Sequence, residues 1–289
     1  MDTDMGPRHT SDLRELRDHV VVGWDGSAHA ERALRWASNQ AALEDRRLGV
    51  VLTDPDDTES LSRTLSSLEP GVGSTGVTVA VQPGDPRDVL VDVSEHAHLL
   101  VVGSRGRGTV RSMLLGSVGA AVSHRASCPV VVSRPPGDLP LRRGIVVGAD
   151  GAPESRPVLE FAYRQAALRD LPLTVLHSYW DAAAALAQHR QALGEDVQDP
   201  ELEELRAGLA TAVAGLAEQF PDVEVTLSLK HGLTDQALAP KEGAWELVVV
   251  GRHPMSGLTR LVTGSVASAV IERSRSSVAV VPVVPSVPA

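Results

Sequence analysis

Two glycine-containing turns are the parts of this chain whose residue types and spacing could do chemistry. The first turn runs from Gly103 to Ser117 with the spacing G-x2-G-x9-G-S. Nearly the same pattern recurs 148 positions later, from Gly251 to Ser265, with Pro254 in place of the second glycine. A glycine turn before a helix offers backbone N–H groups and a favourable helix dipole to one anion. The spacing therefore predicts two phosphate-binding loops.

The residues of the first turn have distinct expected roles. Gly103 and Gly106 would shape the turn, because glycine allows close approach and a positive φ. Gly116 and Ser117 would open the following helix, with the Ser117 hydroxyl as a further donor. Arg105 has two interpretations, a cation that pairs with phosphate oxygens or a solvated loop residue. A glycine turn can also serve packing alone, but two colinear copies favour ligand binding.

A carboxylate follows the first apolar run of each half of the chain, at Asp25 and, 125 positions later, at Asp150. In an open α/β sheet the ligand crevice lies at the carboxyl ends of the strands, where the strand order reverses. Asp25 would face that crevice and accept a hydrogen bond from an adenine amino group or a ribose hydroxyl. The alternative is that both aspartates only cap turns or helices.

Several catalytic motifs are missing from the sequence. The lysines are Lys230 and Lys241, and neither follows a G-x4-G, so there is no Walker A loop for phosphoryl transfer. There is also no G-x-S-x-G or H-E-x-x-H motif. Cys128 stands before a proline and is expected to be a small buried side chain instead of a nucleophile. The residues thus favour holding a phosphate over cleaving it.

Two other patterns have simpler interpretations. Residues 71–76 spell G-x-G-x-x-G but precede a predicted strand instead of opening a helix, so we interpret them as a flexible connection. His96 and His98, together with Asp54, Asp56 and Asp57, could suggest a metal site. They lie on different predicted elements without a closed ligand set, which favours a solvated surface.

The elements that must position the first turn alternate regularly. Apolar runs predict strands at 19–24, 48–53, 77–81, 99–103 and 130–133, and helices are expected at 28–43, 59–68, 86–96 and 117–126. This order of strand and helix is typical of an α/β fold, with a parallel sheet covered by helices and right-handed crossovers.

The pattern restarts after a proline-rich stretch. Strands are expected at 144–149, 173–178, 223–229, 247–251 and 278–281, and helices at 153–168, 182–219, 233–243 and 265–274. The loop offset exceeds the first-strand offset by 148 − 125 = 23 residues, which we place around 181–220. The sequence predicts a tail at 1–17, domains at 18–134 and 143–283, a linker at 135–142 and a tail at 284–289.

Composition narrows the class of protein. The net charge is −10, and each half carries −5, with 14 basic against 19 acidic residues in 1–140 and 13 against 18 in 141–289. This acidic balance argues against a nucleic-acid or anionic-membrane surface. The chain has a single cysteine, an acidic N-terminus and no apolar run long enough to span a membrane. We therefore expect a cytoplasmic protein.

The segment Asp25-Gly26-Ser27, the G-x2-G-x9-G-S run and the closing segment 128–132 resemble the universal stress protein family. The chain resembles the tandem two-domain form over residues 18–134 and 143–283. The resemblance implies two tandem Rossmann-like domains, each a five-stranded parallel sheet with helices on both faces, ATP bound with Mg²⁺ in many members, and domain pairing through the last strand.

By position, the resemblance also implies two nucleotide sites. The first would be lined by Asp25, Thr53, Gly103, Arg105, Gly106, Gly116, Ser117 and Val118. The second would be lined by Asp150, Ser178, Gly251, His253, Gly264, Ser265 and Val266.

The second copy departs from the family pattern at Pro254. Proline has no N–H and a fixed φ, so one potential phosphate donor is lost. One donor to a charged ligand contributes about 1.5–3 kcal/mol, or roughly ten- to a hundredfold in affinity. We therefore expect the first site to bind ATP more tightly than the second.

The resemblance implies regulation under stress more than turnover. We expect an ATP-binding, nucleotide-dependent regulator that acts on an unidentified protein partner and is not an enzyme. Exposed last strands would also allow a homodimer. The alternatives are a slow ATPase or nucleotidyl-transferring enzyme, and an interaction scaffold that has lost its nucleotide.

Overall fold

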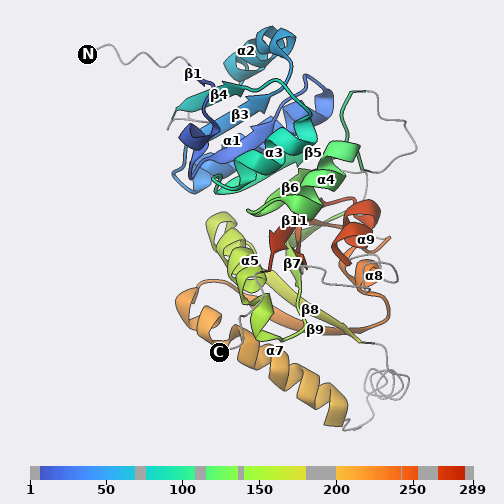
Figure 1. The fold of residues 1–289 in the computed structure, drawn as a ribbon. Helices are drawn as coiled ribbons and strands as arrows, with labels where there is room; N and C mark the ends of the chain where they lie inside the picture. The colour runs from blue at the N-terminus through green and yellow to red at the C-terminus, as the bar shows by residue number, and fades with distance from the viewer. Residues whose placement is uncertain are drawn as a thin grey trace, which may run out of the picture. The chain divides into compact units, whose positions relative to one another are not determined.

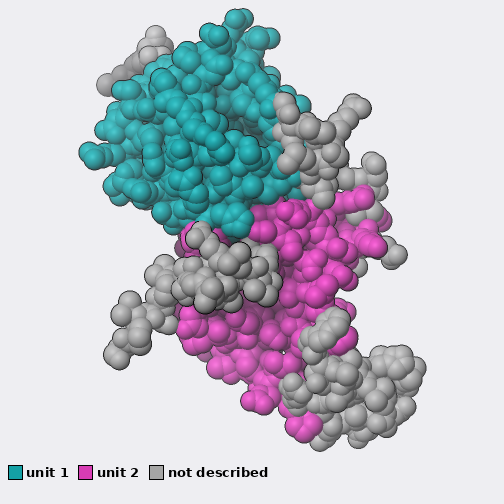
Figure 2. Space-filling model, turned by 45° about the vertical axis from the view of Figure 1, so that its right-hand side comes forward, with its two compact units in different colours: residues 1–136, 277–280 teal, residues 137–276, 281–289 magenta. Residues whose placement is uncertain are grey.

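The computed structural model describes residues 7–68, 76–107, 115–135, 140–179, 200–241, 243–252 and 266–283 (Figure 1). The chain divides into two compact units, which Figure 2 shows in teal and magenta. Unit 1 comprises residues 1–136 and 277–280, and unit 2 comprises residues 137–276 and 281–289.

Unit 1 is built on a parallel sheet with the order β4-β3-β2-β5-β6. Its strands are β2 (Val20–Gly23), β3 (Leu48–Leu52), β4 (Val77–Val81), β5 (Leu99–Gly103) and β6 (Val130–Ser133). Its helices are α1 (Ala28–Leu43), α2 (Thr58–Ser66), α3 (Pro86–Ser94) and α4 (Ser117–Arg125). The five strands predicted for a parallel α/β sheet are confirmed for this unit, and further strands, described below, pair with both edges of that sheet.

The strands of unit 1 have few polar residues because helices cover them. Every residue of β3 and β6 is buried, as expected for strands that are covered on both faces. Helix α1 begins at a capping serine, Ser27, whose side chain accepts a hydrogen bond from the N–H of Ala30 at 3.1 Å. Its buried face consists largely of alanine, which lets the helix lie close to the sheet.

Residues 8–16 differ from the expected N-terminal tail. Strand β1 (Arg8–Thr10) pairs in parallel with β4, so that Arg8 lies opposite Thr78. A short 3-10 helix, η1 (Leu13–Leu16), follows, and Leu16 is fully buried. A strand of three polar residues has no apolar periodicity, so the sequence offered no local pattern from which to predict it.

Unit 2 contains a parallel sheet with the order β10-β7-β8-β9. Its strands are β7 (Leu141–Gly148), β8 (Leu173–Tyr179), β9 (Val225–His231) and β10 (Ala244–Arg252), and its helices are α5 (Arg156–Arg169), α7 (Pro200–Gln219), α8 (Thr234–Leu238) and α9 (Val266–Arg273). A 3-10 turn, η3 (Pro153–Ser155), leads into α5.

Several predicted boundaries in unit 2 were inaccurate. Strand β7 already begins at Leu141, inside the expected linker, and α8 has only five residues of the helix that was expected at 233–243. The long helix predicted at 182–219 is observed from Pro200, and residues 182–199 lie outside the described part of the chain.

The last strand, β11 (Ser277–Pro282), contributes residues 277–280 to unit 1. There it pairs antiparallel with β6, and Val280 lies opposite Val130. Strand β6 therefore has a neighbour on each side, and the expectation of an exposed last strand is wrong for β6. Within the described ranges, no helix has the length and apolar character needed to cross a membrane.

Candidate functional site

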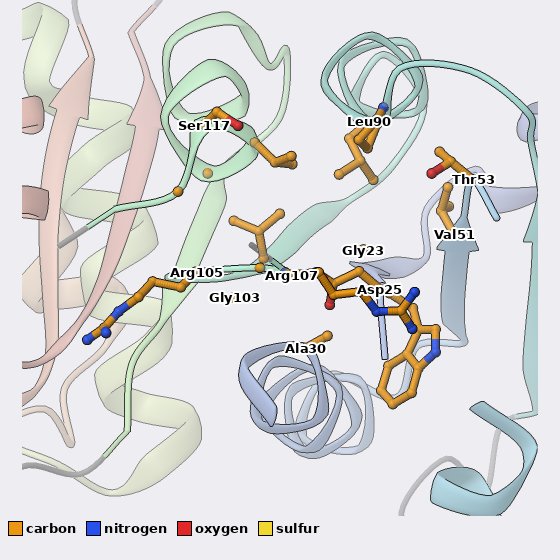
Figure 3. Close-up of a pocket in the computed structure, with 17 residues that line it drawn as sticks. Gly23, Asp25, Ala30, Val51, Thr53, Leu90, Gly103, Arg105, Arg107 and Ser117 are labelled. Atoms are coloured by element: carbon orange, nitrogen blue, oxygen red, sulfur yellow. The ribbon is translucent and has the colours of Figure 1, made fainter. Parts of the chain in front are cut away.

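Unit 1 contains a cavity of about 220 Å³ at the carboxyl ends of β2, β3 and β5 (Figure 3). It lies where the strand order reverses between β2 and β5, which is the usual ligand position in an open α/β sheet. All eight residues expected at the first site line this cavity, namely Asp25, Thr53, Gly103, Arg105, Gly106, Gly116, Ser117 and Val118. Their role toward a ligand stays a prediction.

The glycine turn needs glycine because of close contacts and not because of a left-handed backbone. A Cβ atom on Gly106 would lie 2.7 Å from Asp25 Oδ2, and one on Gly103 would lie 2.9 Å from the backbone carbonyl of His29. Neither residue has a positive φ, so that part of the expectation is wrong. The turn is therefore packed tightly against both the Asp25 loop and helix α1.

The start of helix α4 lines the same cavity. Gly116 is the capping residue, and it has no side chain that could accept from the first N–H groups of the helix. Its own N–H donates to the carbonyl of Ser104 at 2.9 Å, which joins the glycine turn to the helix. The N-terminal end of α4 thus faces the cavity with its favourable dipole and without a side-chain cap.

Asp25 has a local structural role that the sequence suggested as an alternative. Its Oδ1 accepts from the N–H of Ser27 at 3.0 Å, and its Oδ2 accepts from the N–H of Arg107 at 3.0 Å. The carboxylate therefore closes its own turn and connects it to the glycine loop, while it also lines the cavity.

The two arginines of the glycine loop point in different directions. In Figure 3 the Arg105 side chain runs away from the other labelled residues, so its expected charge is not directed into the cavity. Burial, and to a smaller extent the charge of Arg105, lowers the pKa of Arg134 to about 10. Burial also lowers the pKa of His29, and Arg32 and Arg105 add to that effect. Arg105 thus belongs to a basic cluster of unit 1.

No role at this site was predicted for Arg107, and Asp57 was expected on a solvated surface. The Arg107 guanidinium forms an ion pair with Asp57, a carboxylate whose side chain is only 7% exposed. The interpretation of Asp57 as solvated surface is therefore wrong. His98 was also assigned to the surface, but it is only partly exposed and its Nε2 lies 2.6 Å from Glu44 Oε2. The place of Arg107 directly after a loop glycine was the one sequence feature that could have indicated its role at the site.

Cys128 is buried, as expected from its place before a proline. Burial raises the pKa of its thiol to about 12. A thiol with such a pKa is a poor nucleophile near neutral pH, because the thiolate is the reactive species.

Unit 2 has a second cavity, of about 290 Å³, in the corresponding place. Four of the residues expected at the second site line it, namely Asp150, Ser178, Gly251 and Val266. Asp150 Oδ1 accepts from the N–H of Ala152 at 3.0 Å and from the Ser155 hydroxyl at 2.6 Å. His253, Pro254, Gly264 and Ser265 lie outside the described residues, so the expected difference between the sites stays a prediction.

Comparison with known proteins identifies the group to which the chain belongs. The pattern of the Universal stress protein family matches residues 57–134 and 142–282. A universal stress protein of Mycolicibacterium smegmatis is 30% identical over 290 residues, which cover 91% of this chain and 96% of that protein. One of Mycobacterium tuberculosis is 28% identical over 288 residues, covering 90% and 96%.

Solved structures agree with this assignment at the level of the fold. A universal stress protein from Archaeoglobus fulgidus has a TM-score of 0.60 and 19% identity, covering 91% of this chain and 98% of that chain. A putative universal stress protein from Pseudomonas aeruginosa has a TM-score of 0.62 and 17% identity, covering 94% and 95%. Because the family pattern matches both halves and the relatives extend over nine-tenths of the chain, this chain belongs to the universal stress protein family, in its tandem two-domain form.

Proposed function

We propose that the chain is an ATP-binding regulator in a stress response, and that its unit 1 cavity is the principal nucleotide site. One observation carries the proposal: a glycine turn, an uncapped helix start and a carboxylate meet in one cavity at the reversal of strand order. The membership in the family is compatible with this role.

The cavity walls suit the two parts of a nucleotide. Val51, Leu90 and Ala30 supply apolar surface for a base, and Thr53 and Asp25 lie beside them with polar groups. The glycine turn and the first turn of α4 supply backbone N–H groups for phosphates. Mg²⁺ prefers phosphate oxygens and water, with few protein ligands, so it would be held mainly through the ATP, with the Ser117 hydroxyl as an available oxygen.

The same walls favour binding over turnover. Among the described residues that line the cavity there is no lysine to stabilise a transferred phosphoryl group. The carboxylate of Asp25 already accepts two backbone hydrogen bonds, which leaves it poorly placed to act as a base. We therefore propose a site whose occupancy is the signal, with a protein partner that reads it.

Calorimetric titration of the full chain with ATP and Mg²⁺ tests the proposal. The variant Gly106→Ala should weaken ATP binding at least tenfold, because its Cβ would displace Asp25. Gly208→Ala in α7 is the matched control, since nothing lies within 4 Å of its added methyl group, and it should bind as the wild type does.

Two further measurements separate the alternatives. Mass spectrometry of the denatured protein should detect co-purified adenine nucleotide, and incubation with ATP should return ATP unchanged. If neither calorimetry nor mass spectrometry detected bound nucleotide, the nucleotide-free interaction scaffold would be the remaining alternative. Release of ADP that Gly106→Ala abolishes would favour the slow enzyme.

A further inference from the structure

Arg107 connects three loops of the cavity edge. It belongs to the loop after β5, its backbone N–H donates to Asp25 after β2, and its guanidinium pairs with Asp57 after β3. In Figure 3 its side chain extends from the glycine loop past Asp25, in the direction opposite to that of Arg105. Arg107 therefore lines the cavity and also contacts Asp57, which is not one of the lining residues.

The ion pair is asymmetric in its exposure. The Asp57 side chain is 7% exposed, whereas that of Arg107 is 55% exposed. The carboxylate is therefore the member that depends on the pair, because a buried charge without a partner is strongly unfavourable. The guanidinium keeps access to solvent and to a ligand. One of its nitrogens lies so close to Gly26 that a Cβ there would clash with it.

Asp57 also connects the cavity to the following segment. The Ser60 hydroxyl donates to the carbonyl of Asp57 at 2.8 Å and accepts from Trp24 Nε1 at 3.3 Å. Trp24 lines the cavity, and Asp57 precedes α2 directly. A change at the ion pair would therefore alter the contacts of residues 55–66, which comprise η2 (Pro55–Asp57) and α2.

Charge at the cavity makes Arg107 the critical cation. Among the described lining residues the cations are Arg105 and Arg107, and the side chain of Arg105 runs away from the cavity. A phosphate held by the glycine loop would lie beside the backbone of Arg107, because Arg107 directly follows Gly106, and the exposed guanidinium would have to turn away from Asp57 to reach it. Asp57 and an anionic ligand thus have to share one guanidinium.

The following inference rests on the proposed function. We propose that Arg107 makes the site select charged nucleotides over the uncharged nucleoside, and that Asp57 sets the affinity for those nucleotides by competing for Arg107. A triphosphate draws the guanidinium away from Asp57, and the loosened segment 55–66 reports that the site is occupied. The preference for charge and the report of occupancy then depend on the same ion pair.

The test compares ATP with adenosine, the latter measured by displacement of ATP, on the full chain. Arg107→Ala should weaken ATP binding about ten- to a hundredfold and leave adenosine within about twofold. Arg107→Lys should restore part of the ATP affinity, since it keeps the charge. Asp57→Asn should tighten ATP binding. Arg125→Ala is the matched control, because it breaks an exposed ion pair with Asp88 in the same unit but outside the cavity.

Hydrogen exchange tests the proposal without the measurement of a binding affinity. The amides of residues 55–66 should exchange faster in wild type with ATP than without it, and Arg107→Ala without nucleotide should resemble the ATP-bound wild type. If Arg107→Ala lost affinity for ATP and for adenosine by the same factor, or if Asp57→Asn bound ATP more weakly, the ion pair would have only a structural role. If the wild type bound no ATP at all, the proposed function would fail together with this inference.

Discussion

Gly106 and Asp25 approach so closely that a Cβ on Gly106 would lie 2.7 Å from Asp25 Oδ2. The contact joins the loop after β5 to the loop after β2, on the two sides of the point where the strand order reverses. The same oxygen accepts the N–H of Arg107, so the carboxylate and the glycine loop hold each other in place. The shape of the cavity therefore depends on this pair.

Asp25 should contribute to stability as well as to binding. In Asp25→Asn only one side-chain oxygen remains to accept the N–H groups of Ser27 and Arg107, so we expect a loss of about 1–3 kcal/mol in the free energy of unfolding. ATP binding should weaken in parallel. Urea unfolding measures the first effect, and Asp92→Asn, on the exposed face of α3, is the control. Equal unfolding curves for wild type and Asp25→Asn would contradict the structural role.

Gly103 should tolerate no side chain. A Cβ there would lie 2.9 Å from both the carbonyl carbon and the oxygen of His29, and backbone cannot move aside as a flexible side chain can. Gly103→Ala should therefore push α1 from β5 and cost about 1–3 kcal/mol of stability.

Gly215→Ala provides the comparison for Gly103. Position 215 lies within α7 with nothing within 4 Å of the added methyl, so alanine should stabilise the helix by about 0.5–1 kcal/mol. Thermal melting of the two variants checks both signs. A Gly103→Ala protein as stable as the wild type would show that α1 does not pack in this way.

Acid should destabilise the fold through His19. Burial lowers the pKa of His19 below its ordinary 6.5, and among the described residues its Nε2 has no hydrogen-bond partner. The unfolded chain therefore takes up this proton more readily than the folded one does. The contribution of His19 is intact above pH 6.5 and is lost as the pH falls below that value toward the lower folded pKa.

His19→Asn isolates this contribution. Asparagine keeps a donor near the place of His19 Nδ1, which lies 2.8 Å from the carbonyl of Arg17, but it does not titrate. We expect a smaller difference in unfolding free energy between about pH 7.5 and about pH 5.5 in the variant than in the wild type. An unchanged difference would assign the acid sensitivity to other groups.

The two sites should differ in affinity because of Pro254. We expect Gly116→Ala to remove the tighter ATP-binding event seen in calorimetry and Gly264→Ala to remove only the weaker one. The expected ratio is roughly ten- to a hundredfold, from the loss of one N–H donor. Loss of all binding in Gly264→Ala alone would reverse the assignment.

The sequence by itself determined the order of elements and the place of the site. Strands β4, β5 and β6 begin and end where the apolar runs predicted, because strands that are buried on both faces need continuous apolar residues. The glycine turn and Asp25 could be placed at one cavity, because the carboxyl ends of parallel strands meet at one edge, and the resemblance to the family added Thr53 and Val118. The order of elements and the place of the glycine turn need only local periodicity and the rules of sheet topology, whereas Thr53 and Val118 were implied by the resemblance alone.

Only the tertiary structure decided how the side chains and the outer strands are arranged. The ion pair of Arg107 with Asp57 joins positions 50 residues apart, and the opposite directions of Arg105 and Arg107 follow from packing around the loop. Strand β1 and residues 277–280 of β11 are placed by pairing with distant strands. Periodicity reports which residues are buried, whereas side-chain direction and long-range partners depend on contacts that form only when the chain is folded.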